Sequence, residues 1–245
     1  MKTQQNPYKA FILAAGFGTR LRPYTDDRPK PMVEVNGRSL IYRTLDKLRA
    51  AKISEVVVNA HYKADILVQH LNDYAAQHDD IIIHISRESD ILDTGGGVKN
   101  ALHYFNNKPF YVIAGDNLWE DGEIPALERL VKGWDSNKMD ILTLMQPLDN
   151  MKLTGGVGDY DLLENGLVRR SFDKIGAYMW SNIRLNHPRI YEEIEGKSFS
   201  FLDIMDKCEA QKRFYSLVHD DDWHHISTPK DLEMVDEYYK KNENS

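Results

Sequence analysis

The first 147 residues alternate short apolar runs with longer stretches in which apolar residues recur every three or four positions. The short β-branched runs predict strands, and the helical spacing predicts amphipathic helices between them. The predicted strands cover Ala10–Ala15, Glu55–Asn59, Ile81–Ser86, Pro109–Ala114 and Asp140–Pro147. The predicted helices cover Ser39–Ala51, Ala64–Tyr74, Val98–Phe105 and Pro125–Asn137. Repeated strand–helix units indicate parallel strands, and the ligands of such sheets gather at the carboxyl ends of the strands.

The second part of the chain has a different pattern. Turn signals at Thr154–Asp159 and Glu164–Gly166 flank short strand-like pieces and predict a small antiparallel insertion. The elements predicted beyond it are a strand at Ala177–Leu185, helices at Pro188–Ile194 and Leu202–Gln211, a strand at Phe214–Val218 and a helix at Thr228–Lys241. Thr228, Pro229 and Asp231 suit the N-cap and first turn of that last helix, and the final six residues are expected to fray.

Composition excludes several classes of protein. A chain of 245 residues with 42% hydrophobic content can build a core, and its net charge of −7 gives no basic field for nucleic acid. No apolar run approaches the roughly 20 residues of a membrane helix, so a soluble protein is expected. The polar start at Met1–Lys9 and a single cysteine, Cys208, predict a cytoplasmic protein without disulfides. Cys208 is predicted to lie in the core.

The strongest chemical signal follows the first predicted strand. Gly16 and Gly18 let backbone N–H groups approach an anion closely. Four basic residues follow within 11 positions and supply countercharge: Arg20, Arg22, Arg28 and Lys30. The spacing matches neither the dinucleotide fingerprint nor the P-loop. The segment is therefore predicted to be a phosphate-handling loop of another kind, the alternative being an ordinary solvated connection.

Two later segments complete the predicted cleft. Asp93–Gly97 follows the third strand, and its three glycines would let a flat base or sugar lie against the backbone. A plain glycine-rich connection is the alternative. Asn59 ends the second strand, where its side chain could reach the same crevice; the alternative is that it only forms a turn. Asp116 ends the fourth strand, where a lone carboxylate beside phosphates predicts a divalent cation between them; a helix cap is the alternative.

Together these motifs resemble the signature of the sugar-1-phosphate nucleotidylyltransferases, also called nucleoside-diphosphate-sugar pyrophosphorylases. The resemblance rests first on Ala14–Pro23 paired with Pro29–Pro31. Further matches run in order along nearly the whole chain, at Asp93–Gly97, Ala114–Asp116, Gly158–Asp159 and Trp223–Pro229. Within that superfamily, the chain looks most like the N-acetylmuramate 1-phosphate uridylyltransferases and the mannose-1-phosphate guanylyltransferases.

The resemblance implies an α/β fold: a Rossmann-like, mixed but mainly parallel sheet flanked by helices, with a small antiparallel sugar-binding subregion, as in glycosyltransferase-A-like folds. It implies one domain, with a nucleotide-binding part at about 8–147, a sugar-binding part at about 148–228, and a C-terminal helix and tail at 229–245. The implied reaction is metal-assisted in-line transfer from an NTP, with UTP or GTP favoured, to N-acetylmuramate 1-phosphate or a related hexose 1-phosphate. The products would be pyrophosphate and an NDP-sugar, which would serve cell-wall or other nucleotide-sugar synthesis. The enzyme is expected to be a monomer or a small homo-oligomer.

The site residues implied by the resemblance fall into four groups. Arg20 and Lys30 are the expected catalytic residues, because cations offset the charge that gathers when one phosphate attacks another. No protein nucleophile or general base is required. The expected nucleotide-binding residues are Ala14, Ala15, Gly16, Gly18, Thr19, Asn59, Asp93, Gly95 and Gly96. Gly158 and Asp159 are expected at the sugar, and Asp116 and His225 at the metal.

His225 departs from the family pattern, which commonly has an aspartate at this position. Mg2+ is the expected cofactor, but imidazole suits Mn2+ or Co2+ better. His225 could instead orient a metal-bound water. A third alternative draws the missing acid from a neighbouring run, Asp220, Asp221 and Asp222. A zinc site is a weaker reading of the nearby side chains His219, His224, His225 and Cys208.

Two further questions stay open at this point. The first concerns three aromatic residues, which either stack on a hexose or belong to the core: Tyr160, Tyr178 and Trp180. One alternative activity is cytidylyl transfer to phosphocholine, which the Thr-Gly-Gly-Gly run disfavours. The other is nucleotide binding by a non-catalytic regulatory protein, which the replacement of the usual aspartate by His225 suggests.

Overall fold

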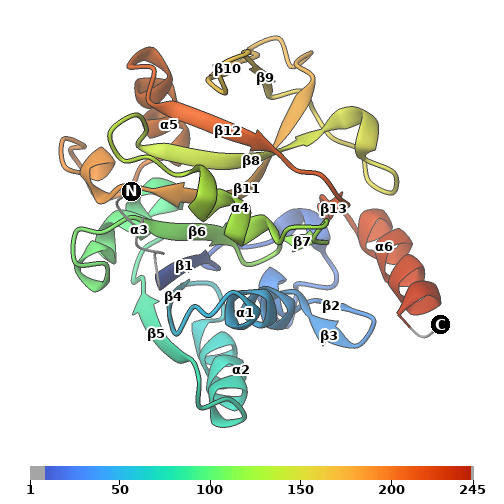
Figure 1. The fold of residues 1–245 in the computed structure, drawn as a ribbon. Helices are drawn as coiled ribbons and strands as arrows, with labels where there is room; N and C mark the ends of the chain where they lie inside the picture. Colours follow the sequence, from blue (N-terminus) through green and yellow to red (C-terminus); the bar gives the residue numbers. More distant parts are fainter. Residues whose placement is uncertain (1–8, 244–245) are drawn as a thin grey trace.

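A nine-stranded sheet runs through the computed structural model, which describes residues 9–243 of the chain (Figure 1). Its strands are β1 (Lys9–Leu13), β4 (Glu55–Ala60), β5 (Ile82–Arg87), β6 (Phe110–Ala114), β8 (Ile141–Pro147), β9 (Tyr160–Leu162), β10 (Val168–Arg170), β11 (Tyr178–Asn186) and β12 (Phe214–Val218). The order β5-β4-β1-β6-β11 branches at β11, which pairs with β8 and, at one residue pair, with β9; β8 continues to β12, and β9 continues to β10. Strands β5, β4, β1 and β6 are parallel, so the prediction of a mixed, mainly parallel sheet is confirmed.

Helices cover both faces of this sheet (Figure 1). They are α1 (Leu40–Ala50), α2 (Ala64–Ala76), α3 (Asp93–Asn100), α4 (Ala126–Gly133), α5 (Phe201–Ala210) and α6 (Pro229–Asn242). Alternate residues of a strand point to opposite faces, so Ala10 and Ile12 of β1 join the core under α1, α2 and α4. Phe11, between them, joins the core under α3 and α5. The two apolar layers therefore fix the sheet between helices.

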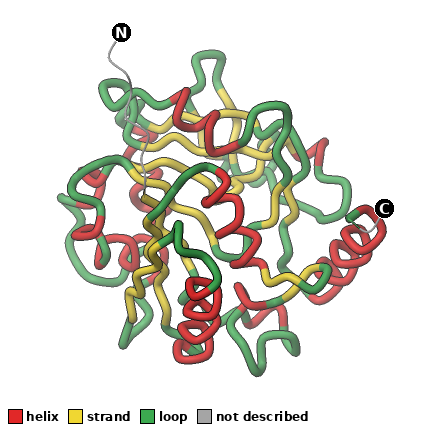
Figure 2. Tube along the Cα trace, turned by 60° about the horizontal axis from the view of Figure 1, so that its bottom comes forward, coloured by secondary structure: helices red, strands yellow, loops and turns green. Residues whose placement is uncertain are grey.

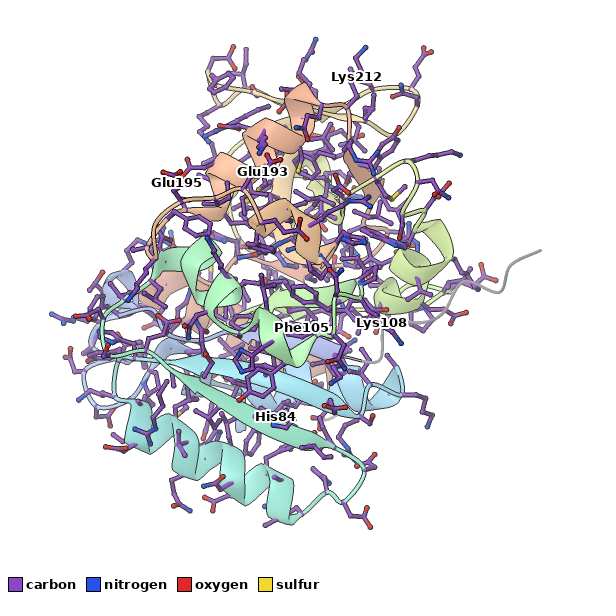
Figure 3. All side chains as sticks on the ribbon, turned by 90° about the vertical axis from the view of Figure 1, so that its left-hand side faces the viewer. His84, Phe105, Lys108, Glu193, Glu195 and Lys212 are labelled. Atoms are coloured by element: carbon purple, nitrogen blue, oxygen red, sulfur yellow. The ribbon has the colours of Figure 1, made fainter. Side chains whose placement is uncertain are left out.

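Aromatic packing connects the α3 side to the sheet. Phe105, labelled in Figure 3, stacks on Phe110 of β6 with ring centroids 3.8 Å apart. It also meets Phe11 of β1 edge-on at 6.5 Å. Geometries of this kind add to the free energy gained by burial alone. They hold β1 and β6 side by side, and the loops after these two strands build the cleft described below.

Two small sheets position the C-terminal segment. In one, β7 (Leu118–Trp119) pairs with β13 (Trp223–His224). This pairing brings the chain before α6 beside the segment that follows β6. In the other, β2 (Glu34–Val35) pairs with β3 (Arg38–Ser39). Figure 2 shows α6 at the edge of the molecule, where its apolar face packs against residues of β2 and the first loop.

Three predicted helices differ from the observed ones. α3 begins at Asp93 rather than Val98 and ends at Asn100, because packing of its glycines outweighs their low helix propensity. α4 ends at Gly133, four residues before its predicted end at Asn137, since Trp134 is extended. The helix predicted at Pro188–Ile194 is only a 3-10 turn over Pro188–Tyr191.

Near the C-terminal end of the chain, two features were not anticipated and one prediction is confirmed. The predicted strand at Ala177–Leu185 is β11, and it inserts antiparallel between β6 and β8 in the central sheet. The prediction that the last six residues fray is wrong for residues 240–243. Helix α6 continues to Asn242, and Glu243 accepts hydrogen bonds from Arg43 and Asn36. The start of α6 is confirmed, with a reciprocal capping box between Thr228 and Asp231.

The prediction of a cytoplasmic protein used the polar start of the chain, of which residues 1–8 lie outside the described part. Over residues 9–243, no helix has both the length and the apolar character needed to cross a membrane.

Candidate active site

The loop after β1 lines a cavity of about 480 Å3, the first cavity, along its whole length from Leu13 to Leu21. The carboxyl ends of β4, β5 and β6 supply the other walls, as expected for parallel strands. Gly18 adopts a left-handed conformation with φ of 62°, and a Cβ there would lie 3.0 Å from the Cβ of Lys30. The turn therefore requires glycine at this position, and it brings the loop against Lys30.

The four basic residues of the loop region divide into two pairs. Arg22 pairs with Asp26 at 3.3 Å, and Arg28 pairs with Asp27 at 2.9 Å. Arg20 and Lys30 instead line the first cavity, and Arg20 forms no ion pair within the described residues. The cations that face the first cavity are therefore Arg20 and Lys30, and of these two Lys30 pairs with Asp116.

Lys30 and Asp116 form the electrostatic centre of the cleft. Their Nζ and Oδ2 atoms lie 2.5 Å apart, and the Asp116 side chain is 32% exposed. Burial acts to raise the pKa of Asp116, but the charge of Lys30 and its hydrogen bond outweigh this effect and lower the pKa. The aspartate is therefore ionised at neutral pH, next to a cation.

A buried hydrogen-bond network holds the start of the loop. The Asn59 carboxamide accepts from the backbone N–H of Ala14 at 2.6 Å and donates to Glu88 at 2.8 Å. Glu88 in turn accepts from the backbone N–H of Leu92 at 3.1 Å. Asn59 thus lines the first cavity but is engaged in positioning Ala14. Glu88 was missed by the sequence reasoning, although its place two residues after a predicted strand was a signal.

The glycines at the start of α3 lie outside the cavity. Asp93 and Thr94 line the first cavity, whereas Gly95 and Gly96 do not. The backbone N–H groups of both glycines donate to the carbonyl of Phe199, at 3.0 and 3.2 Å. The structure therefore brings Asp93 to the predicted nucleotide site and packs Gly95 and Gly96 against another part of the same chain.

A second cavity of about 260 Å3 adjoins the first. It shares five residues with the first cavity: Arg20, Lys30, Ala114, Asp116 and Asn182. His225 and Asp159 line only the second cavity. Gly158 lines neither cavity; a Cβ there would lie 2.0 Å from the carbonyl oxygen of Gly176, so the glycine serves close backbone packing.

The three candidate aromatic residues also separate. Trp180 lines the second cavity, and Tyr160 and Tyr178 do not. Tyr160 is 2% exposed and meets Phe214 edge-on in the core. Only Trp180 is therefore placed to contact a ligand.

The two predicted metal ligands, His225 and Asp116, both line the second cavity. Burial lowers the pKa of His225, helped by Lys30, so its imidazole is neutral at neutral pH and can act as a ligand. Within the described residues there is no group of three His, Cys, Asp or Glu side chains that could hold a metal. A carboxylate and a neutral imidazole are donor types that divalent cations accept.

The alternative ligands lie elsewhere. Asp220 pairs with Arg129 at 2.5 Å, and Asp222 pairs with Lys152 at 2.9 Å. Asp221 accepts from the backbone N–H of Asp222, and these three carboxylates line neither cavity. Cys208 is in the core, as predicted, where burial raises the pKa of its thiol to about 12. The weaker zinc interpretation is therefore not supported.

Comparison with known proteins identifies the family of this chain. The profile of the nucleotidyl transferase family matches residues 9–242. The chain belongs to the nucleotidyl transferase family. The family resemblance carried by the loop motifs is thus confirmed.

Individual relatives of this nucleotidyl transferase cover most of the chain. An N-acetylmuramate alpha-1-phosphate uridylyltransferase of Caulobacter vibrioides is 34% identical over 228 residues, which are 92% of this chain and 94% of that protein. A probable mannose-1-phosphate guanylyltransferase of Oryza sativa is 27% identical over 91% of this chain, which spans only 62% of that protein. A crystal structure of UDP-glucose pyrophosphorylase complexed with UDP-glucose has a TM-score of 0.75 at 18% identity, covering 96% of this chain and 99% of that one. This likeness confirms the predicted fold class.

Proposed function

We propose that this nucleotidyl transferase moves a nucleotidyl group from UTP or GTP to a sugar 1-phosphate, giving an NDP-sugar and pyrophosphate. The observation that carries the proposal is the meeting of Arg20, Lys30 and Asp116 at the junction of two adjoining cavities. One cavity is lined by the glycine loop and suits the NTP. The other contains Asp159 and Trp180 and suits the sugar.

The reaction asks the protein for charge and orientation rather than for a nucleophile. The phosphate of the sugar is ionised at neutral pH and attacks the α-phosphorus directly. In the proposal, N–H groups of the Gly16–Arg20 loop and the Arg20 guanidinium hold the triphosphate. Lys30 leaves Asp116 to contact the reacting phosphate, offsetting negative charge in the transition state.

In this proposal Asp116, with His225 as a possible second ligand, would hold a divalent cation. Mg2+ is the proposed ion, with Mn2+ or Co2+ preferred if His225 is a ligand. When bound, the ion neutralises charge on the phosphate oxygens.

The favoured substrates are UTP and N-acetylmuramate 1-phosphate. The proposal is supported by the uridylyltransferases of Caulobacter vibrioides and of Neisseria meningitidis, the latter 28% identical over 93% of its length. The product would then serve cell-wall synthesis in the cytoplasm. Within one domain, residues at about 8–147 would bind the nucleotide and residues at about 148–228 the sugar, followed by the helix and tail at 229–245.

Pyrophosphate release from a panel of NTPs and sugar 1-phosphates tests the proposal. The panel includes N-acetylmuramate, mannose and glucose 1-phosphates with UTP, GTP and CTP, and it adds phosphocholine as a competing acceptor. Fastest release with UTP and N-acetylmuramate 1-phosphate is the expected result. CTP with phosphocholine as the best pair would replace the sugar assignment, and NTP binding without any release would indicate a regulatory protein. Light scattering of the same sample measures whether the protein is a monomer or a small homo-oligomer.

A further inference from the structure

Strand β11 is interrupted by a bulge at the point where it passes the two cavities. Trp180 pairs with Met145 of β8, and the next paired residue, Arg184, lies opposite Thr143. Three residues of β11 therefore face a single residue of β8. At the centre of the bulge, Asn182 has a left-handed conformation with φ of 59°, which asparagine tolerates better than most residues.

Hydrogen bonds hold the backbone of this bulge in place. The Ser181 hydroxyl donates to the carbonyl of Leu144 at 2.8 Å. The Asn117 carboxamide donates to the carbonyl of Asn182 at 3.3 Å, and the Thr143 hydroxyl donates to that of Ile183 at 3.0 Å. These bonds hold the backbone from which the Asn182 side chain projects. Bulges commonly re-aim a side chain in this way.

The partner of Asn182 is an unusual buried cation. Arg184 is 0% exposed, and its guanidinium lies 3.8 Å from the ring centroid of Phe201 and 5.2 Å from that of Trp180. Its Nη1 donates to Oδ1 of Asn182, while Nε and Nη2 are buried without a hydrogen-bond partner. No carboxylate pairs with it among residues 9–243. An apolar side chain would cost less free energy here, so stability does not explain this arginine.

Arg184 determines which end of the Asn182 carboxamide faces the cavities. A guanidinium only donates hydrogen bonds, so Oδ1 must turn toward Arg184. The Nδ2 group is left as a donor, and it makes no hydrogen bond within the described residues. Burial lowers the pKa of Arg184 to about 10, so it remains a donor at neutral pH. Asn182 lines both cavities, beside Lys30 and Asp116.

We propose that Asn182 is a specificity-determining residue whose Nδ2 donates a hydrogen bond to an acceptor oxygen of the sugar 1-phosphate, and that Arg184 is its positioning residue. This inference rests on the proposed function, because it assigns the sugar 1-phosphate to the second cavity. The acceptor oxygen lies on the part of the substrate that crosses the junction, between the phosphate and the sugar ring. A substrate without an acceptor there leaves Nδ2 unpaired and binds more weakly.

Two substitutions of Asn182 test the donor. Asn182→Gly removes the carboxamide and still tolerates the left-handed backbone; it is expected to raise KM for N-acetylmuramate 1-phosphate about tenfold and leave KM for UTP unchanged. Asn182→Asp replaces the donor by a negative acceptor and is expected to raise the same KM further. The matched control is Asn107→Gly, at another left-handed asparagine outside both cavities, with φ of 54°. It is expected to keep both KM values.

A double-variant cycle tests the role of Arg184. Arg184→Met is expected to raise KM for the sugar 1-phosphate about tenfold, with kcat changed less than KM, and to add nothing in the Asn182→Gly background. An additive loss in the double variant would overturn the positioning role. If Arg184→Met does not fold, the two Asn182 variants still decide the donor role.

The outcomes separate this inference from the proposed function. A wild-type enzyme that releases no pyrophosphate with any sugar 1-phosphate overturns the proposed function and the inference with it. An active wild type whose Asn182→Gly variant keeps its KM for the sugar 1-phosphate, or loses affinity equally for UTP, overturns the inference alone.

Discussion

Two glycine-rich segments look alike in the sequence and behave differently in the structure. A Cβ added to Gly16, in the loop after β1, would meet no atom within 4 Å. A Cβ added to Gly95, at the start of α3, would lie 2.3 Å from the Phe199 ring, and one at Gly96 would lie 2.1 Å from the carbonyl oxygen of Lys197. The space beside Gly16 is open, and this residue lines the first cavity. Gly95 and Gly96 have no room for a side chain, because Phe199 and Lys197 of the same chain fill the space beside them.

The difference shows what a glycine run does and does not specify. Glycine marks a place where something approaches the backbone closely, and the approaching group is either a ligand or another segment. At Gly95 and Gly96 the backbone N–H groups are also taken by Phe199. Contact with a nucleobase would therefore come from Asp93 and Thr94, which line the first cavity.

The largest effect is expected on the open side of this comparison. Lys30→Ala should lower kcat about a hundredfold, because it removes a preorganised charge from the transition state, while the protein still folds. Steady-state kinetics of pyrophosphate release measures the change. Lys132→Ala is the control, since Lys132 pairs with Glu128 on α4 and lines neither cavity. Near wild-type turnover in Lys30→Ala would remove Lys30 from the site.

The packed side should respond in stability. Gly95→Ala is expected to lower the free energy of unfolding by about 2 kcal/mol, because the new methyl group overlaps the Phe199 ring. Urea denaturation measures the loss, and adding Phe199→Ala should restore part of it by vacating the space. Unchanged stability in Gly95→Ala would mean that residues 197–199 do not press on α3.

The matching substitution in the open loop should respond in binding. Gly16→Ala is expected to keep the free energy of unfolding within about 0.5 kcal/mol and to raise KM for the NTP about tenfold as the methyl group narrows the first cavity. Gly155→Ala serves as the control, because Gly155 also has open space around it but lines neither cavity. Equal KM values for the two variants would contradict a ligand-facing role for Gly16.

The smallest expected effect concerns the cation. His225→Asp should shift the preference from Mn2+ toward Mg2+ by about threefold, because a carboxylate is the harder ligand. Titration of activity with each ion measures the ratio. His103→Asp, at an exposed histidine outside both cavities, is the control. An unchanged ratio in His225→Asp would show that His225 is not a ligand.

Local patterns in the sequence were sufficient for much of the fold and for part of the site. The alternation of apolar residues predicted β1, β4, β5, β6 and β8, because strand and helix periods are properties of neighbouring residues. The capping box of α6 was predictable for the same reason, since its partners Thr228 and Asp231 are three residues apart. The loop at Gly16–Arg20 and the carboxylate of Asp116 were recognisable because each directly follows an apolar strand.

Contacts between distant residues were decided only by the tertiary structure. The residues around Gly95 in the sequence do not predict its contact with Phe199. Those around Ala14 do not predict its hydrogen bond to Asn59, or the bond from Asn59 to Glu88. The insertion of β11 between β6 and β8 likewise depends on the path of the whole chain. That insertion creates the bulge at Asn182 and buries Arg184 behind it. Periodicity and capping act over a few residues, whereas the neighbour of a buried side chain depends on which segments pack together, and that is settled when the complete core forms.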